Sequence, residues 1–507
     1  MKKFLKYIPI AALSLVACEP EFDNAVEDGF YSSGEANFSN YVSIGNSLTA
    51  GFADSALYIT GQENSYPNIM AQQFELVGGG EFTQPLMNDN LGGLLLGGTQ
   101  ITQNRFVLAV GADGNPSPSV LSGTPTTEVT ATLSGPFNNI GVPGAKSYHL
   151  VAPGYGNAAG VATGQANPYY ARFASSADAT VIGEAVTQDP SFFSLWIGNN
   201  DILGYATSGG SGVDQTGNFD PSTYGSSDIT DPNVFASVYS QMVDLMVGTG
   251  ADGVLVNLPD VTSVPFFTTV PTQSIPLDAD TAAALNANFA AYNTQVLGGL
   301  LQAGVITQEE FAARQINFTE GVNFPIMVDD DLTNIAAIIS GPPFNLPAPT
   351  AGLLAQLRQV NSTDLMTLTS SSVLGTPVAG VPNAVNGVSF PLADQFVLTV
   401  TEQARVSAAQ ASYNATIQAL AQANGLAFVD ARAALQAVAA GGVAFDGGVL
   451  SSTFATGGAF SLDGVHPTPR GYAFTANAII DAINEQYGAT VPKVNIGNYA
   501  TITASND

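Results

Sequence analysis

Short apolar runs alternate along this chain with longer stretches in which an apolar residue recurs every third or fourth position. The runs at 40–44, 192–197, 253–257 and 426–430 are rich in strand-forming residues, and the run at 192–197 is almost continuously apolar. Such a run is typical of a strand that is buried on both faces. Helices are expected over the periodic stretches, at 66–74, 234–249, 281–303, 351–360, 401–424, 431–439 and 471–486.

Strands that alternate with helices predict an α/β fold, in which helices flank both faces of a mostly parallel sheet in three layers. Two long segments interrupt the alternation. Residues 75–135 are rich in Gly, Thr and Pro, and residues 268–400 hold Ala/Leu-rich helical stretches broken by Pro/Gly loops. We expect both to be large insertions into one domain that spans 38–490, with a C-terminal tail at 491–507.

The composition indicates a folded chain with an acidic surface. Hydrophobic residues make up 45% and charged residues 10%, and 41 acidic against 12 basic residues give a net charge of −29. Such a charge repels phosphate backbones, which disfavours nucleic acid as a partner. We interpret the acidity as solubility in a salty or extracellular setting. Calcium binding at Asp329–Asp331 is the alternative, although no spaced calcium-loop pattern surrounds that run.

The N-terminus carries the only cysteine, Cys18, which excludes an internal disulfide. A positive start at Met1–Lys3 and an apolar stretch up to Val16 precede it, and this stretch is shorter than the span of about 20 residues that a membrane needs. The segment resembles a bacterial lipoprotein signal peptide, residues 1–17, cut before a lipidated Cys18. A cleaved secretory signal with an incidental cysteine is the alternative.

A lipid on Cys18 would attach the protein to a membrane without crossing it. The acidic residues 18–37 would then be a tether, and Glu19, Glu21 and Asp23 resemble the surface-export signals of Bacteroidota lipoproteins. The expected location is the cell envelope, lipid-anchored at the outer membrane and facing the cell surface. Oligomeric state stays open.

Polar residues follow three of the predicted strands, at Gly45–Ser47, Gly198–Asp201 and Asp430. In open parallel sheets, sites form beyond the C-terminal ends of the strands. Taken alone, Ser47 fits a helix cap better than a nucleophile. Far along the chain, Asp463 stands three positions before His466, which is one of only two histidines. Histidine is the side chain best suited to proton transfer near neutral pH, so His466 is the candidate base.

Four blocks together resemble the SGNH/GDSL hydrolases, a family with a three-layer, flavodoxin-like fold. The segment 41–51 resembles the family's nucleophile block, and 139–145 resembles the block that supplies a glycine N–H. Gly198–Asp201 matches its G-x-N-D block and Asp463–His466 its D-x-x-H block. Each block alone is weak evidence, but all four occur in the family's order.

The resemblance implies a role for each matched residue. Ser47 would be the nucleophile, His466 its base, and Asp463 the residue that orients His466. The oxyanion hole would comprise the backbone N–H groups of Ser47 and Gly144 and the side chain of Asn200.

Three neighbouring residues, Asn199, Asp201 and Asn46, bear on these role assignments. Asn199 is the adjacent candidate for the oxyanion hole, but the spacing favours Asn200, with Asp201 as a structural partner. Asn46 stands where the family usually has Asp, which puts fine positioning in question.

The resulting hypothesis is hydrolysis of carboxylic esters, of acyl or lipid type, through an acyl-enzyme and without a cofactor or metal. We expect the apolar insertions to cover the site and to favour acyl esters. A glycan O-deacetylase of the same fold and a non-catalytic lipid- or glycan-binding surface lipoprotein are the alternatives. His149 is interpreted as a surface-loop histidine, with substrate contact as its alternative, and Trp196 as a core residue.

Overall fold

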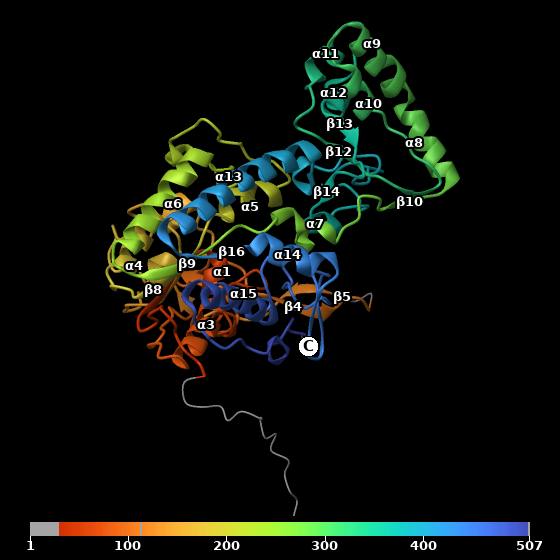
Figure 1. The fold of residues 1–507 in the computed structure, drawn as a ribbon. Helices are drawn as coiled ribbons and strands as arrows, with labels where there is room; N and C mark the ends of the chain where they lie inside the picture. Colours follow the sequence, from red (N-terminus) through yellow and green to blue (C-terminus); the bar gives the residue numbers. More distant parts are fainter. Residues whose placement is uncertain (1–29, 112–113, 505–507) are drawn as a thin grey trace, which may run out of the picture.

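Five parallel strands form the central sheet of the computed structural model, which describes residues 30–111 and 114–504 (Figure 1). The predicted α/β class and parallel sheet are therefore confirmed. The strands lie in the order β16-β9-β8-β1-β7, which is 2-1-3-4-5 when read from β7 in chain order. This is a doubly wound order, whose direction reverses between the first and third strands. The strands are β1 (Tyr41–Gly45), β7 (Asn139–Gly141), β8 (Phe192–Trp196), β9 (Asp252–Val256) and β16 (Ala427–Val429).

The two strands at the reversal, β1 and β8, are buried along their whole length. Their apolar residues fill the core on both faces, as the continuous run at 192–197 predicted. Three polar groups inside the sheet satisfy one another, because Ser43 Oγ lies 2.8 Å and Tyr41 Oη 2.7 Å from Ser194 Oγ. The pairing aligns Gly45 with Trp196, so the residues that come after both strands emerge at the same edge of the sheet.

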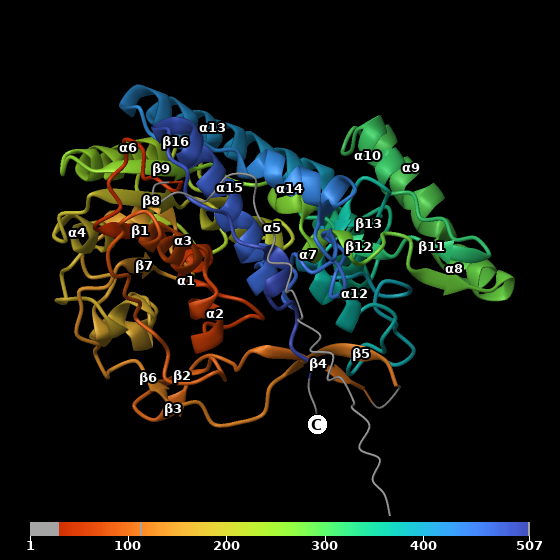
Figure 2. The same ribbon diagram turned by 60° about the horizontal axis from the view of Figure 1, so that its bottom comes forward.

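Helices cover both faces of the sheet (Figures 1 and 2). One layer contains α3 (Tyr66–Glu75) and α15 (Pro469–Tyr487), which contact each other, and α15 packs on β9 and β16. The other contains α4 (Val181–Val186), α6 (Pro232–Val247) and α13 (Val400–Asn424). Helix α4 contacts β1, α13 contacts β9 and β16, and α6 contacts both of these helices. Smaller elements close the body: α1 (Ser47–Ala50), α2 (Ile59–Glu63), α5 (Asn200–Thr207), α7 (Pro265–Thr268), α14 (Ala431–Ala440), β17 (Val443–Phe445) and β18 (Gly448–Leu450).

A lobe between α7 and α13 projects from this body (Figure 1). It has hydrophobic clusters of its own, one around Leu297 and Leu300 and one around Met327 and Leu392. Its elements are β10 (Ile275–Leu277), α8 (Ala279–Ala291), α9 (Leu297–Gln302), α10 (Gln308–Ala313), β11 (Gly321–Asn323), β12 (Ile326–Val328), α11 (Ala336–Ser340), α12 (Ala348–Leu354), β13 (Leu357–Gln359), β14 (Leu365–Met366) and β15 (Val397–Leu398).

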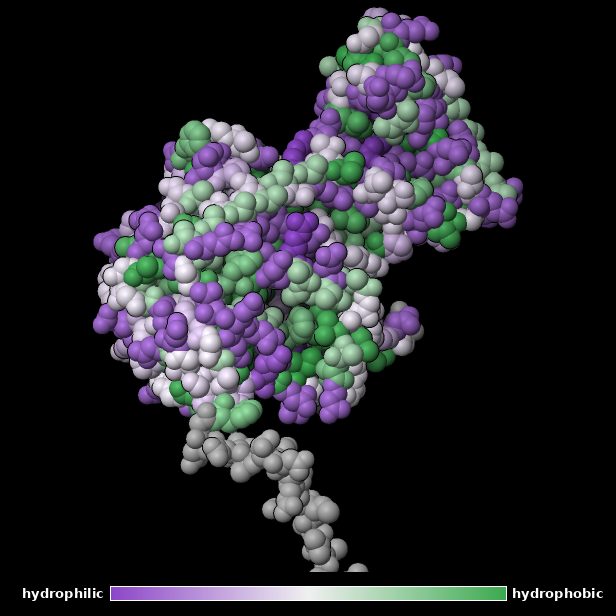
Figure 3. Space-filling model, in the orientation of Figure 1, coloured by the Kyte–Doolittle hydropathy of each residue, from purple (hydrophilic) through white to green (hydrophobic). Residues whose placement is uncertain are grey.

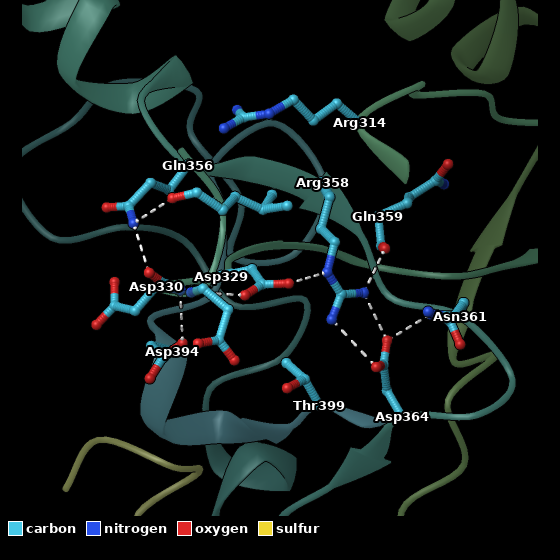
Figure 4. Close-up of polar contacts among 12 residues, drawn as sticks. Arg314, Asp329, Asp330, Gln356, Arg358, Gln359, Asn361, Asp364, Asp394 and Thr399 are labelled. Carbon is cyan, nitrogen blue, oxygen red and sulfur yellow. Dashed lines mark hydrogen bonds and ion pairs between the residues drawn. The ribbon is translucent and has the colours of Figure 1, made fainter. Parts of the chain in front are cut away.

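The helix expected over 351–360 is wrong in its second half. Helix α12 ends at Leu354, and Leu357–Gln359 form strand β13, which pairs antiparallel with β12. The buried side chain of Arg358 lies in this strand and donates hydrogen bonds to Asp329 and Asp364 (Figure 4). Pairing with these two carboxylates and with β12 outweighs the local helical preference.

Two of the three carboxylates in the acidic run at 329–331 pair with arginines. Asp329 pairs with Arg358, and Asp331 lies 2.5 Å from Arg405. No group of three or more acidic, His or Cys side chains within 30–111 and 114–504 is arranged to hold a metal ion. The geometry of the run therefore supports ion pairing.

Segment 75–135 forms short strands beside the body, as expected: β2 (Leu94–Leu96), β3 (Thr99–Gln100), β4 (Phe106–Val110), β5 (Pro116–Val120) and β6 (Thr127–Glu128). The described ends of the chain are more tightly packed than expected. Glu35 N–H donates to Tyr487 O at 2.8 Å and Ala36 is buried, so the last part of the expected tether lies against α15. In the expected tail, Val491 is buried and Leu108 N–H donates to Thr503 O.

The signal peptide and Cys18 lie outside the described residues. Across the part of the chain that is described, no helix combines the length and the apolar character needed to cross a membrane.

Candidate active site

Ser47 lies at the point where the strand order reverses, immediately beyond the end of β1. Asn46 caps the short helix α1: its Oδ1 accepts a hydrogen bond from Leu48 N–H at 3.0 Å. Its Nδ2 donates to Asn199 Oδ1 at 3.1 Å, which joins the end of β1 to the end of β8. Asn46 thus supplies two fixed hydrogen bonds directly before Ser47.

The turn requires glycine at position 45, because neighbouring atoms leave no room for a side chain there. A Cβ at Gly45 would lie 2.1 Å from Thr49 Oγ1 and 2.4 Å from Trp196 O. The close approach brings the start of α1 against the end of β8. Ser47 is 6% exposed and lines the same pocket as Asn200. The sequence therefore builds a rigid elbow at Ser47.

Ser47, His466 and Asp463 form one hydrogen-bonded chain. His466 Nε2 lies 2.9 Å from Ser47 Oγ, and His466 Nδ1 lies 2.9 Å from Asp463 Oδ2. An ionised carboxylate only accepts hydrogen bonds, so the proton of the neutral ring sits on Nδ1. The lone pair on Nε2 is then free to accept the hydroxyl proton of Ser47. This is the arrangement that a general base requires.

Asp463 is held ionised by its surroundings. Burial alone would raise the pKa of its carboxyl, but the charge of His466 and hydrogen bonds from the backbone N–H groups of His466 and Val465 lower it to about 2. Oδ1 accepts these bonds at 2.8 and 2.9 Å, together with one from Ser461 Oγ at 3.1 Å. Asp463 therefore carries its charge throughout the neutral pH range.

A fourth support comes from a loop that sequence reasoning missed. Asp54 and Ser55 both adopt left-handed backbone conformations, with φ of 52° and 65°. This bend points Ser55 N–H at Asp463 Oδ2, 2.9 Å away, while Asp54 Oδ1 accepts from Leu462 N–H at 3.0 Å. No sequence signal marks this pair, since neither residue is the glycine that such conformations favour.

Phe52 from the same loop packs on the candidate base. Its ring centroid lies 4.7 Å from that of His466. The His466 side chain is 14% exposed in this arrangement.

The oxyanion-hole candidates gather at the same edge. Gly144 follows the end of β7 with φ of +80°, and Asn200 begins α5 and donates from Nδ2 to Ala145 O at 2.8 Å. Within the described residues, neither Ser47 N–H nor Gly144 N–H donates a hydrogen bond to another residue. Asn200 retains a second N–H. These donors are free for a developing negative charge.

Asp201 is buried and structural, as expected. It accepts from Ser147 N–H at 2.8 Å and from Ser147 Oγ at 2.6 Å. These bonds join two segments: the loop that contains Gly144 and the helix that contains Asn200. Burial raises the pKa of Asp201, and the bonds from Ser147 oppose that effect.

A largely apolar pocket of about 120 Å³ opens beside Ser47 and His466. The described residues that line it belong to the body and not to the segments 75–135 or 268–400. Those segments therefore do not supply the apolar lining of this pocket, although their composition led us to expect it. Its apolar surface comes instead from strand ends, from α14 and α15, and from the loops around them.

His149 is half-buried and Trp196 is buried. The His149 ring stacks on Tyr155 with centroids 4.4 Å apart, its Nδ1 accepts from Lys146 N–H at 3.0 Å, and burial lowers its pKa to about 4. His149 is therefore a half-buried residue of the short 3-10 helix Ser147–Val151, with aromatic neighbours beside its ring. Trp196 is a core residue as expected, and its indole N–H donates to Asn257 O at 3.1 Å.

Comparison with known proteins leaves the site to be interpreted from its own geometry: no family model, no curated protein and no solved structure matches the chain.

Proposed function

We propose that the protein is a serine hydrolase of carboxylic esters, of the SGNH type, with Ser47, His466 and Asp463 as its catalytic triad. The observation that carries the proposal is the continuous hydrogen-bonded chain from Ser47 Oγ through His466 to Asp463. Its place at the reversal of strand order, among unpartnered N–H groups, adds support. The segments 75–135 and 268–400 are, on this proposal, insertions into the hydrolase fold.

In the first half-reaction, Ser47 Oγ attacks the carbonyl carbon of the ester and His466 Nε2 takes the hydroxyl proton. The negative charge on the former carbonyl oxygen is stabilised by the N–H groups of Ser47 and Gly144 and by the Asn200 side chain. Asp463 stabilises the imidazolium that has formed. The intermediate collapses when His466 gives its proton to the alkoxide oxygen, so the alcohol leaves and an acyl-Ser47 ester remains.

In the second half-reaction, a water molecule replaces the alcohol. His466 accepts a proton from the water as its oxygen attacks the acyl carbon. Collapse of the second intermediate breaks the bond to Ser47 Oγ, which recovers its proton from His466. The acid product leaves and the triad returns to its starting state.

We also propose that the mature protein begins at a lipidated Cys18, which holds the catalytic body at the cell envelope. The supporting observations are the positive start, the short apolar stretch and the position of the only cysteine. Metabolic labelling with a clickable palmitate analogue tests this in a bacterial host. Label is expected on the wild-type chain and lost in Cys18→Ala.

Hydrolysis of p-nitrophenyl butyrate tests the catalytic proposal. The wild-type protein is expected to release p-nitrophenol, and Ser47→Ala to reduce the rate to that of the buffer. Ser55→Ala is the matched control, because it removes a hydroxyl near the site but retains the backbone N–H that contacts Asp463. Full activity in folded Ser47→Ala would refute the assigned nucleophile.

A further inference from the structure

The pocket beside Ser47 has a polar end and a long apolar remainder. Its polar lining is Ser47, Asn199, Asn200, His466 and Thr475, and four of these five belong to the catalytic edge. No Lys, Arg, Asp or Glu side chain from the described residues lines it, although the chain carries a net charge of −29. A sugar or charged group would lose its hydrogen bonds with water in such a pocket, whereas a hydrocarbon would lose nothing.

Two helices give the apolar part its length. From α15 the lining residues are Gly471, Phe474, Thr475 and Ala478, a spacing that places them on one face of the helix. The stretch from Gly471 to Ala478 covers about 10 Å of helix axis. Gly471 lies five residues after His466, so this stretch of α15 leads away from the triad along the pocket.

Helix α14 lines the pocket over a similar length. Its lining residues run from Ala431 to Val438, and Leu435 and Val438 are both buried. The ends of β9 and β16 contribute Val256 and Val429 beneath them.

The surface beside this pocket is also apolar. Leu450 of β18 lines the pocket, and its neighbour Val449 is 58% exposed. Hydrophobic side chains gather on the same side of the molecule, in the region where Figure 1 places α14, β4 and β5 (Figure 3). A chain that enters the pocket would therefore cross little polar surface.

We infer that this pocket is an acyl-chain subsite, and that the substrates are esters of medium-chain or longer fatty acids. The inference rests on the proposed function. The ester carbonyl lies at Ser47, and the acyl chain extends between α14 and α15 past Phe474 towards Ala478 and Val438. Acetyl esters would leave the subsite empty.

A series of p-nitrophenyl esters from acetate to decanoate tests the subsite. Each added methylene that enters the pocket is expected to raise kcat/KM about three- to fourfold, until the pocket is filled. Ala478→Phe places a ring inside the pocket, away from the triad. It is expected to lower kcat/KM for decanoate at least tenfold and to leave that for acetate within twofold.

Two further variants control the experiment. Glu485→Phe adds the same ring on an exposed position of α15 and should leave the whole series unchanged. Val438→Ala enlarges the far part of the pocket and should shift the preference to longer chains, which gives a second readout if Ala478→Phe does not fold. A melting curve for each variant verifies folding.

The outcomes separate this inference from the catalytic proposal. Ser47-dependent cleavage of acetate with no rise along the series would overturn the acyl subsite and leave the hydrolase intact. In a second series, the alkyl group of alkyl acetates is lengthened. If kcat/KM rises along that series, Ala478→Phe removes the rise, and the acyl series stays flat, the pocket holds the alcohol. That result would also overturn the acyl subsite. Absence of Ser47-dependent cleavage of every ester would refute the hydrolase itself.

Discussion

Ser47 Oγ lies 2.9 Å from His466 Nε2, although 419 positions separate the two residues in the sequence. The contact exists because β1 ends at the reversal of strand order, and because the segment before α15 returns across the same edge of the sheet. The structure thus joins the two blocks that the sequence places near its opposite ends.

Asp463→Asn should lower kcat by roughly 10⁴-fold with little change in KM. The amide keeps the size of the carboxyl but removes the charge that stabilises imidazolium and fixes the ring proton on Nδ1. Steady-state kinetics at pH 8 measure the effect, and Ser461→Ala, which removes one bond to Asp463, should cost far less. Equal kinetics for Asp463→Asn and wild type would exclude Asp463 from the triad.

Asn200→Ala should reduce kcat by about 10² to 10³ if its side chain stabilises the oxyanion. The effect should fall on kcat more than on KM, because the bond forms only as charge develops. A variant with unchanged kcat and a lower melting temperature would show that Asn200 is only structural, through its bond to Ala145 O.

The low pKa of Asp463, about 2, fixes where acid affects its contribution to stability. The folded pKa lies below the unfolded value of 3.8, so the contribution is complete above about pH 4 and is lost as pH falls towards 2. Chemical denaturation at pH 5 and pH 3 should show a loss that Asp463→Asn does not share. An identical loss in the variant would contradict the assignment.

Glu402 should make the protein less stable as pH rises. Burial, together with the nearby Asp394 carboxyl, raises the pKa of Glu402 from 4.5 to about 8. The folded state therefore holds this proton more tightly than the unfolded chain, and stability falls between about pH 4.5 and 8. Glu402→Gln keeps an oxygen for Thr399 N–H and should remove part of this fall.

Chemical denaturation at pH 5 and pH 8 measures the Glu402 effect. The exposed Glu485→Gln is the matched control and should retain the wild-type difference between the two pH values. The same pH difference in Glu402→Gln as in wild type would contradict the prediction.

Arg358→Met should destabilise the lobe between α7 and α13 by about 3–5 kcal/mol, because it leaves the buried carboxylates of Asp329 and Asp364 unpaired. Adding Asp329→Asn and Asp364→Asn should recover much of that loss, since no buried charge then remains. Thermal unfolding distinguishes the two variants. A triple variant no more stable than the single one would argue that shape, and not charge, explains the effect.

The sequence predicted the layers and brought the site residues to one edge through simple rules. Apolar runs such as 192–197 marked the buried strands, and parallel pairing places the residues after Gly45 beside those after Trp196. Long-range packing was beyond these rules. The left-handed loop at Ser55 carries no glycine, and β13 pairs with β12, which lies about 30 residues earlier in the chain.

In the pocket, too, local elements could be predicted from the sequence but long-range packing could not. Helices α14 and α15 were both predicted from periodicity, but the space that they line depends on long-range packing, which local pattern does not encode. The apolar surface was therefore sought in the long segments 75–135 and 268–400, and it lies elsewhere.

Intact-mass analysis after treatment with a fluorophosphonate tests the central claim most directly. The folded wild-type protein should gain one phosphonyl group, located on Ser47 by peptide mapping, and Ser47→Ala should gain none. His466→Ala should react far more slowly, because no other described histidine contacts Ser47. An unmodified wild-type protein, or equal labelling of wild type and His466→Ala, would contradict a catalytic triad at Ser47.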